Sequence, residues 1–177
     1  EDPRWRTLHP RLLFGADDIP RLREQMNQPA VRPYYDQLLE GCEGMISADD
    51  RRYLDPAKDY GFGAGVPIPG EKCCELALAY VLTDRREFSD HALAVLTRWS
   101  ARLGYEDAVH PHDWVGAGWM VASLALCYDW LYGAMTDEQR ASLRIGIAEL
   151  CQAIYDNTNT EQFVDMSVRN WQAMAAG

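Results

Sequence analysis

The sequence predicts an all-α fold in which antiparallel helix hairpins follow one another along the chain. Apolar residues recur every three to four positions over most of its length, which is the spacing of one face of a helix. No segment alternates apolar and polar residues in the way that a half-buried strand requires. Short turns separate the periodic segments, so we expect neighbouring helices to pack antiparallel.

The first two predicted helices lie near the amino terminus. One begins after the acidic pair Asp17 and Asp18, whose carboxylates suit the start of a helix, and it has Pro20 in its first turn. The next helix is expected to bury one apolar stripe. That stripe consists of Val31, Tyr34, Leu38, Cys42 and Met45.

A long segment without helical periodicity follows, from Ser47 to Gly70. Its glycines and prolines predict a loop, and loops of this length in compact domains often carry function. A plain linker between two helical layers is the other interpretation. Within this segment Tyr60 is a candidate platform for stacking a sugar ring, because aromatic faces suit such contacts.

Helical spacing resumes from Cys73 to Tyr80, and after Asp84 it continues from Phe88 to Leu103. These two segments predict a helix hairpin. The loop that follows it, residues 104–113, leads into a mostly apolar run from Trp114 to Tyr128. This run is shorter than the roughly 20 residues that cross a bilayer, so it predicts a buried helix that ends near Tyr132.

The last clear helix is predicted by a capping box. Thr136 and Gln139 have the spacing at which a hydroxyl and an amide side chain satisfy each other's backbone donors. The stripe of this helix consists of Leu143, Ile147, Leu150 and Ile154. A further helix is expected to begin near Ser167, without a stop signal before Gly177. We therefore expect residues 1–177 to be one amino-terminal portion of a domain, truncated at its carboxyl end.

Composition limits the classes of partner. The chain has 17 basic and 27 acidic residues, a formal net charge of -10, which argues against a general surface for nucleic acids or anionic membranes. The five cysteines are odd in number and lie among apolar residues, so buried thiols are expected. Cysteine usage leaves the compartment open, and these residues show no signal peptide, a segment that exported proteins lose on maturation. The location that we expect is the periplasm or the outside of the cell.

Three stretches resemble the heparinase II/III-like polysaccharide lyases. The His-Pro-Arg-Leu-Leu-Phe run at residues 9–14 is similar to the amino-terminal signature of that family. The Tyr-Asp-Trp-Leu-Tyr run at residues 128–132, with the capped helix after it, is similar to a helix end of these lyases. Finally, residues 169–177 resemble the helix that carries an Asn-Trp or Asn-His pair in the lyases and in related glycosaminoglycan epimerases.

The resemblance implies an (α/α) toroid, of which this chain would supply a part. It also implies cleavage of uronic-acid polysaccharides, such as alginate or a glycosaminoglycan, by β-elimination. Such a site neutralises a carboxylate, removes the adjacent proton and protonates the leaving oxygen. The resemblance assigns the proton transfers to Tyr and His residues mostly further along the chain. A fragment without them is expected to be inactive alone, and epimerisation is the open alternative to elimination.

Asn170 matches the carboxylate-contacting Asn of the family, since an amide can donate to a carboxylate that becomes an enolate. Capping or crossing between helices is the structural alternative for Asn170. Trp171 stands where some relatives have a catalytic His, and its indole can stack on a sugar but cannot exchange a proton near neutral pH. Arg169 is a candidate cation for an acidic sugar, although a salt bridge is the more frequent role.

The loop before the apolar helix supplies further substrate-binding candidates, His110, His112 and Trp114. Two histidines this close suit a metal or a carboxylate, but no third ligand has a matching position, so we expect no metal and no other cofactor. Trp119 and Trp130 are assigned to the core. His9 and His91 are expected to be structural, and Arg11 is a lesser candidate for binding an acidic sugar.

Two other functions remain open at this stage. A toroid-fold glycoside hydrolase would need two carboxylates across its cleft, and Asp107 and Asp113 are the loop candidates. A non-catalytic helical interaction module is the second alternative. In that case, and for any truncated toroid, the exposed edge is expected to self-associate or to be covered by the remainder of its own chain.

Overall fold

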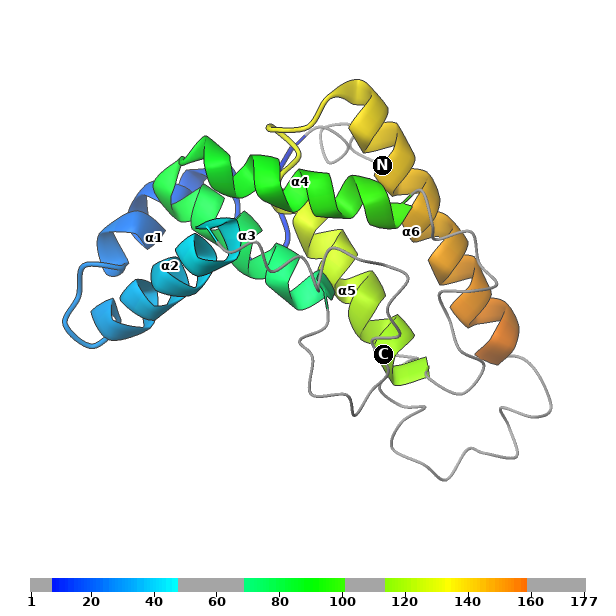
Figure 1. Ribbon diagram of the computed structural model, residues 1–177, viewed down its shortest axis with the longest axis horizontal. Helices are drawn as coiled ribbons and strands as arrows, with labels where there is room; N and C mark the ends of the chain where they lie inside the picture. The colour runs from blue at the N-terminus through cyan, green and yellow to red at the C-terminus, as the bar shows by residue number, and fades with distance from the viewer. Residues whose placement is uncertain (1–7, 48–68, 101–113, 159–177) are drawn as a thin grey trace.

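The computed structural model describes residues 8–47, 69–100 and 114–158, in which a short 3₁₀ turn, η2 (Ala16–Asp18), precedes six α-helices (Figure 1). No strand occurs within these ranges, and the predicted all-α class is confirmed. The helices are α1 (Ile19–Gln25), α2 (Arg32–Ser47), α3 (Pro69–Thr83), α4 (Arg86–Ser100), α5 (Trp114–Trp130) and α6 (Asp137–Thr158).

The helices pack on others that lie close to them along the chain. Helix α3 contacts α1 on one side and α5 on the other, while α4 contacts α2 and α6 in the same way (Figure 1). Within the consecutive pairs, α3 packs on α4 and α5 packs on α6. Helix α2 also contacts α3, and α1 does not pack closely on α2, so paired packing holds for α3 with α4 and for α5 with α6. This is the packing that consecutive helix hairpins produce when they stack side by side.

The core lies where α3, α4 and α5 meet. Leu76 from α3, Phe88 and Leu96 from α4, and Leu124 from α5 are almost completely buried. Helix α5 is apolar on nearly all sides, so it can lie only among other helices. Removing these side chains from water is the main favourable contribution to the fold, at about 1.5–3 kcal/mol for each large one.

Two short connections hold the helices of consecutive pairs together. Between α3 and α4, Asp84 has a φ of 61° and its backbone N–H donates to the carbonyl of Tyr80 at 2.7 Å. Asp tolerates this left-handed conformation better than most residues do. Before α6, the N–H of Gln139 donates to Thr136 Oγ1, and the N–H of Thr136 donates to Gln139 Oε1. The predicted capping box is thereby confirmed.

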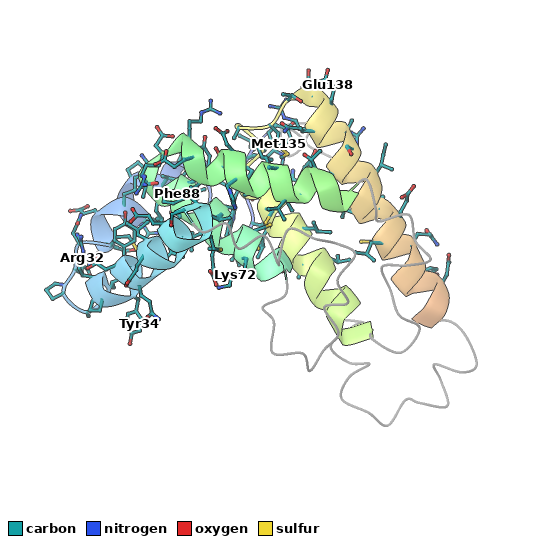
Figure 2. The ribbon with its side chains drawn as sticks, in the orientation of Figure 1. Arg32, Tyr34, Lys72, Phe88, Met135 and Glu138 are labelled. Carbon is teal, nitrogen blue, oxygen red and sulfur yellow. The ribbon has the colours of Figure 1, made fainter. Side chains whose placement is uncertain are left out.

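Three details of the sequence interpretation are wrong. Tyr34 was placed on the buried stripe of α2, but it is 73% exposed and points away from the other helices (Figure 2). Asp18 does not cap α1 with its side chain, because its Oδ2 accepts from the N–H of Gly15 in the preceding turn. Cys151 is exposed on α6 instead of buried.

Other details agree with the periodicity. Leu143 and Leu150 are buried on α6, and Trp130 is buried at the end of α5 as expected. Helix α3 begins at Pro69, slightly before the predicted loop end at Gly70, and residues 48–68 of that predicted loop lie outside the described ranges. None of the described helices combines the length and the apolar character that crossing a bilayer requires.

Candidate functional site

Most residues that the sequence nominates for substrate contact lie outside the described ranges. They are Tyr60, His110, His112, Arg169, Asn170 and Trp171, together with the hydrolase candidates Asp107 and Asp113. Trp114 is the first residue of α5, but its side chain is not among those described. The roles of all these residues therefore stay predictions.

The described ranges contain a buried polar cluster, built around Asp129 near the end of α5. This carboxylate is 2% exposed, so it needs hydrogen-bond donors to compensate for lost water. His9 Nδ1 lies 2.6 Å from its Oδ1, while the backbone N–H groups of Arg11 and Leu12 donate to its Oδ2 at 2.7 and 2.8 Å. We call this set, with Trp130, the Asp129 clamp.

The neighbouring Trp130 adds a second attachment for the same amino-terminal segment. Its Nε1–H donates to the carbonyl of Leu12 at 3.1 Å, and its ring stacks on Phe14 with the centroids 5.4 Å apart. Two adjacent residues of α5 thus hold the backbone of residues 9–14 from both its donor and its acceptor sides. The segment has no helix of its own, so these contacts determine where it lies.

Aromatic rings enclose the imidazole of the clamp. His9 stacks on Tyr132 with the ring centroids 3.8 Å apart, and Tyr128 meets it edge-on at 6.0 Å. Arg140 of α6 lies over the Tyr132 ring, 4.4 Å from its centroid, and its Nε donates to the Tyr132 carbonyl. The cluster therefore joins the amino-terminal segment, the end of α5 and the first turn of α6.

The position of the proton between His9 and Asp129 limits the chemistry that this cluster can perform. An ionised carboxylate only accepts hydrogen bonds, so an ionised Asp129 requires the proton of His9 to be on Nδ1. The same Asp–His pairing orients a catalytic imidazole in many enzymes. Here, however, the His9 side chain is only 4% exposed and is stacked against tyrosine. This geometry anchors a chain segment and leaves little room for a sugar, as the sequence assignment of His9 to a structural role anticipated.

Arg11 has a backbone role in the clamp as well as a distant ionic one. Its Nε lies 3.9 Å from Asp129 Oδ1, with the guanidinium side chain 38% exposed. Its N–H is part of the clamp itself. The positive side chain therefore faces a carboxylate of its own chain, which makes it a weaker candidate for binding an acidic sugar than the sequence alone indicates.

A pair of cysteine sulfur atoms, outside the Asp129 clamp, lies at the contact between α3 and α5. Cys74 Sγ is 3.5 Å from Cys127 Sγ and 3.3 Å from the carbonyl oxygen of Ser123. The hydrogen bond between the Cys127 and Cys74 thiols and burial both raise the pKa of the Cys127 thiol well above its ordinary value. Burial likewise raises the pKa of Cys73. These thiols are therefore protonated, weakly nucleophilic groups near neutral pH.

The sequence does not predict the contacts of the Asp129 clamp or the contact between Cys74 and Cys127, although the residues involved stand out in the sequence. Asp129 is an acidic residue directly after a long apolar run, and a buried carboxylate must find donors. The partner was not readable, because His9 lies 120 positions away. Likewise Cys74 and Cys127 are 53 positions apart, and only the packing of α3 on α5 brings them together.

Among the described residues, no group of His, Cys, Asp or Glu side chains has the arrangement of a metal site. No family model and no curated protein gives a match to the sequence of this chain.

Proposed function

We propose that this chain forms part of the helical toroid of a polysaccharide lyase that cleaves uronic-acid polymers by β-elimination. The packing of α3 on α4 and of α5 on α6, with the two pairs side by side, supports this proposal. In a toroid, hairpins stack side by side so that one layer lines the inner wall and the other forms the outer wall. The contacts of α3 with α1 and α5, and of α4 with α2 and α6, follow that pattern.

The observation that carries the proposal is the Asp129 clamp. Two of the three stretches that resemble the lyases, residues 9–14 and 128–132, lie far apart in the sequence and meet directly in the structure. His9, Leu12 and Phe14 from the first stretch contact Asp129, Trp130 and Tyr132 from the second. This direct pairing is what we expect of two runs that together build one structural unit of the proposed toroid.

The proposed chemistry begins at the substrate carboxylate. Asn170 would donate to this carboxylate and stabilise the negative charge that grows on it as the adjacent proton leaves. Arg169 would add a positive charge nearby, and Trp171 would stack on a sugar ring. The electron pair of the broken C–H bond forms a double bond, and the glycosidic oxygen departs and takes a proton. Tyr and His side chains carry these two proton transfers in the lyases that the chain resembles.

The substrate and location follow from the same chemistry. The partner that we propose is an acidic polysaccharide or oligosaccharide, without a cofactor. We propose that the polysaccharide is degraded in the periplasm or outside the cell. Because the chain carries a net charge of -10, local groups such as Arg169, His110 and His112 must offset repulsion of the polyanion.

The test is an activity assay on the protein encoded by the complete natural gene. Alginate, heparan sulfate, hyaluronan and chondroitin are supplied separately, and product formation is followed by the ultraviolet absorbance of the new conjugated double bond. We expect absorbance to rise with one class of polymer, and we expect Asn170→Ala to reduce the rate by about 100-fold. The matched control is Asn27→Ala, which removes an exposed amide and should leave the rate unchanged.

The alternatives give different results in the same assay. Reducing ends that appear without new absorbance would indicate hydrolysis and contradict the proposal, and Asp107→Asn with Asp113→Asn would then identify the carboxylates. Inversion of a uronate without chain cleavage would indicate an epimerase. Full activity in Asn170→Ala would remove that residue from the site.

One observation favours a second function, a helical interaction module. Helix α6 has an outward face on which Ile145 is 56% exposed and Tyr155 is 65% exposed, with the exposed Cys151 between them. This face lies opposite the buried side that carries Leu143 and Leu150. Such a stripe is suited to packing against another helix.

A further inference from the structure

We propose that Cys74 and Cys127 form a redox site, at which a small-molecule disulfide such as oxidised glutathione converts the two thiols to a disulfide that fastens α3 to α5. The two sulfur atoms are 3.5 Å apart, and a disulfide bond is about 2.0 Å long. The sulfurs therefore need to approach by only about 1.5 Å, a distance that side-chain rotation and a small helix shift can supply.

The elements that carry the two cysteines hold them in place. Helices α3 and α5 pack directly on each other at the centre of the fold (Figure 1). Cys74 also points its sulfur at the carbonyl oxygen of Ser123, one turn before Cys127 on α5. The pair is thus positioned by a packed interface, so its proximity does not depend on a loop.

Exposure decides where the reaction starts. Cys74 is half-buried, whereas Cys127 and the neighbouring Cys73 are buried. An external disulfide can therefore reach Cys74 first. Cys151 is exposed on α6, and it is expected to form mixed or intermolecular disulfides that must be separated from the internal reaction.

The reaction balances as two exchanges. Cys74 loses its proton, and its thiolate attacks one sulfur of oxidised glutathione, so that a mixed disulfide forms and one glutathione thiolate leaves. Cys127 then loses its proton and attacks Cys74 Sγ, which forms the internal disulfide and releases the second glutathione thiolate. The protein loses two electrons and two protons, and one oxidised glutathione becomes two reduced molecules.

The second exchange is the slow one. Because burial and the Cys74 hydrogen bond raise the pKa of Cys127, little of its thiolate exists at neutral pH. Alkaline pH is therefore expected to accelerate closure. The dithiol would persist in a reducing compartment and close slowly where disulfide oxidants are abundant, as in the periplasm.

The cross-link would have a structural consequence for the region between its ends. It would join two residues that are 53 positions apart, and the sequence between them includes α4 and the predicted substrate-binding residues His110 and His112. Closing a loop of this size restricts the unfolded chain, so the oxidised protein should melt at a higher temperature than the reduced protein. We expect a shift of about 5–15 °C.

The experiment uses the whole chain with Cys151→Ser, which removes the exposed thiol. The protein is equilibrated in mixtures of reduced and oxidised glutathione, quenched with acid, unfolded and alkylated, and then weighed by mass spectrometry. The expected product is lighter by two hydrogens and retains two fewer alkyl groups. Cys74→Ala and Cys127→Ala should each abolish this product, while the matched controls Cys73→Ala and Cys42→Ala should retain it.

The outcomes separate cleanly once folding is checked by helical circular dichroism under reducing conditions. A bridge that requires both Cys74 and Cys127, with the higher melting temperature, supports the proposal. Full alkylation of the Cys151→Ser protein at every glutathione ratio would overturn it. So would a bridge that survives Cys74→Ala, because Cys73 would then be the partner of Cys127. A bridge without a rise in melting temperature would contradict the fastening of α3 to α5.

Discussion

At the scale of single residues, the structure depends on buried polar groups that have found specific partners. Asp129 is the main example, because its two oxygens accept from one side chain and two backbone groups. The net gain from such a set is modest, but the cost of leaving its members unpaired is large. Replacing the carboxylate should therefore cost more than an ordinary surface substitution.

We predict that Asp129→Asn lowers the free energy of unfolding by about 2–4 kcal/mol, because the new NH₂ group must face a donor. Urea denaturation followed by circular dichroism measures the change. The control Asp90→Asn alters an exposed carboxylate on α4 and should change stability by less than about 0.5 kcal/mol. Equal effects of the two substitutions would show that the clamp does not anchor residues 9–14.

A second residue-scale prediction concerns Cys42. Burial raises the pKa of its thiol from 9.0 to about 12, so the unfolded chain releases this proton at a lower pH than the folded chain. The stabilising contribution is complete below pH 9 and is lost as the pH rises from about 9 to about 12. The wild-type urea midpoint should thus fall more steeply in this window than that of Cys42→Ala. Parallel curves for the two proteins would contradict the burial of this thiol.

At the scale of elements, local sequence signals determine where helices begin and end. The side chains of Thr136 and Gln139 satisfy each other's backbone N–H groups at the start of α6. In the connection between α3 and α4, Thr83 and Asp84 turn the chain within two residues. These devices are local, which is why the sequence predicts them.

We predict that Thr136→Ala destabilises the protein by about 1 kcal/mol, because it leaves the N–H of Gln139 without its hydroxyl acceptor. Thr136→Ser keeps the oxygen and should retain most of the stability. Thermal melting of the three proteins, compared at one pH, measures both effects. A Ser variant as unstable as the Ala variant would indicate that the methyl group, and not the cap, is responsible.

At the scale of the whole molecule, long-range packing decides what local patterns cannot. The periodicity of α6 correctly places Leu143 and Leu150 in the core, because one buried face is enough to mark a helix. The same reasoning fails for Tyr34, since α2 lies at one end of the described helices and none of them covers that side (Figure 1). The contact between His9 and Asp129 could not be predicted either, because neither local sequence indicates the partner residue.

The exposed stripe of α6 gives a prediction at this scale. We expect two copies of the chain to associate through this face, because Ile145 and Tyr155 present apolar surface to water. Light scattering across a concentration series should show the mass rising toward that of a dimer under reducing conditions. Ile145→Glu with Tyr155→Glu should hold the chain at the mass of a monomer. Gln28→Glu with Gln37→Glu, two exposed positions outside α6, adds negative charge away from this face and is the control.

The most direct measurement is a crystal structure of the protein encoded by the complete gene, with a uronate oligosaccharide bound. We predict that the helix hairpins curve into a ring and that the Asn170 side chain, on its inner wall, lies within hydrogen-bond distance of a uronate carboxylate. Helices stacked as a flat bundle, or an oligosaccharide bound away from Asn170, would contradict the proposal that this chain builds part of a lyase.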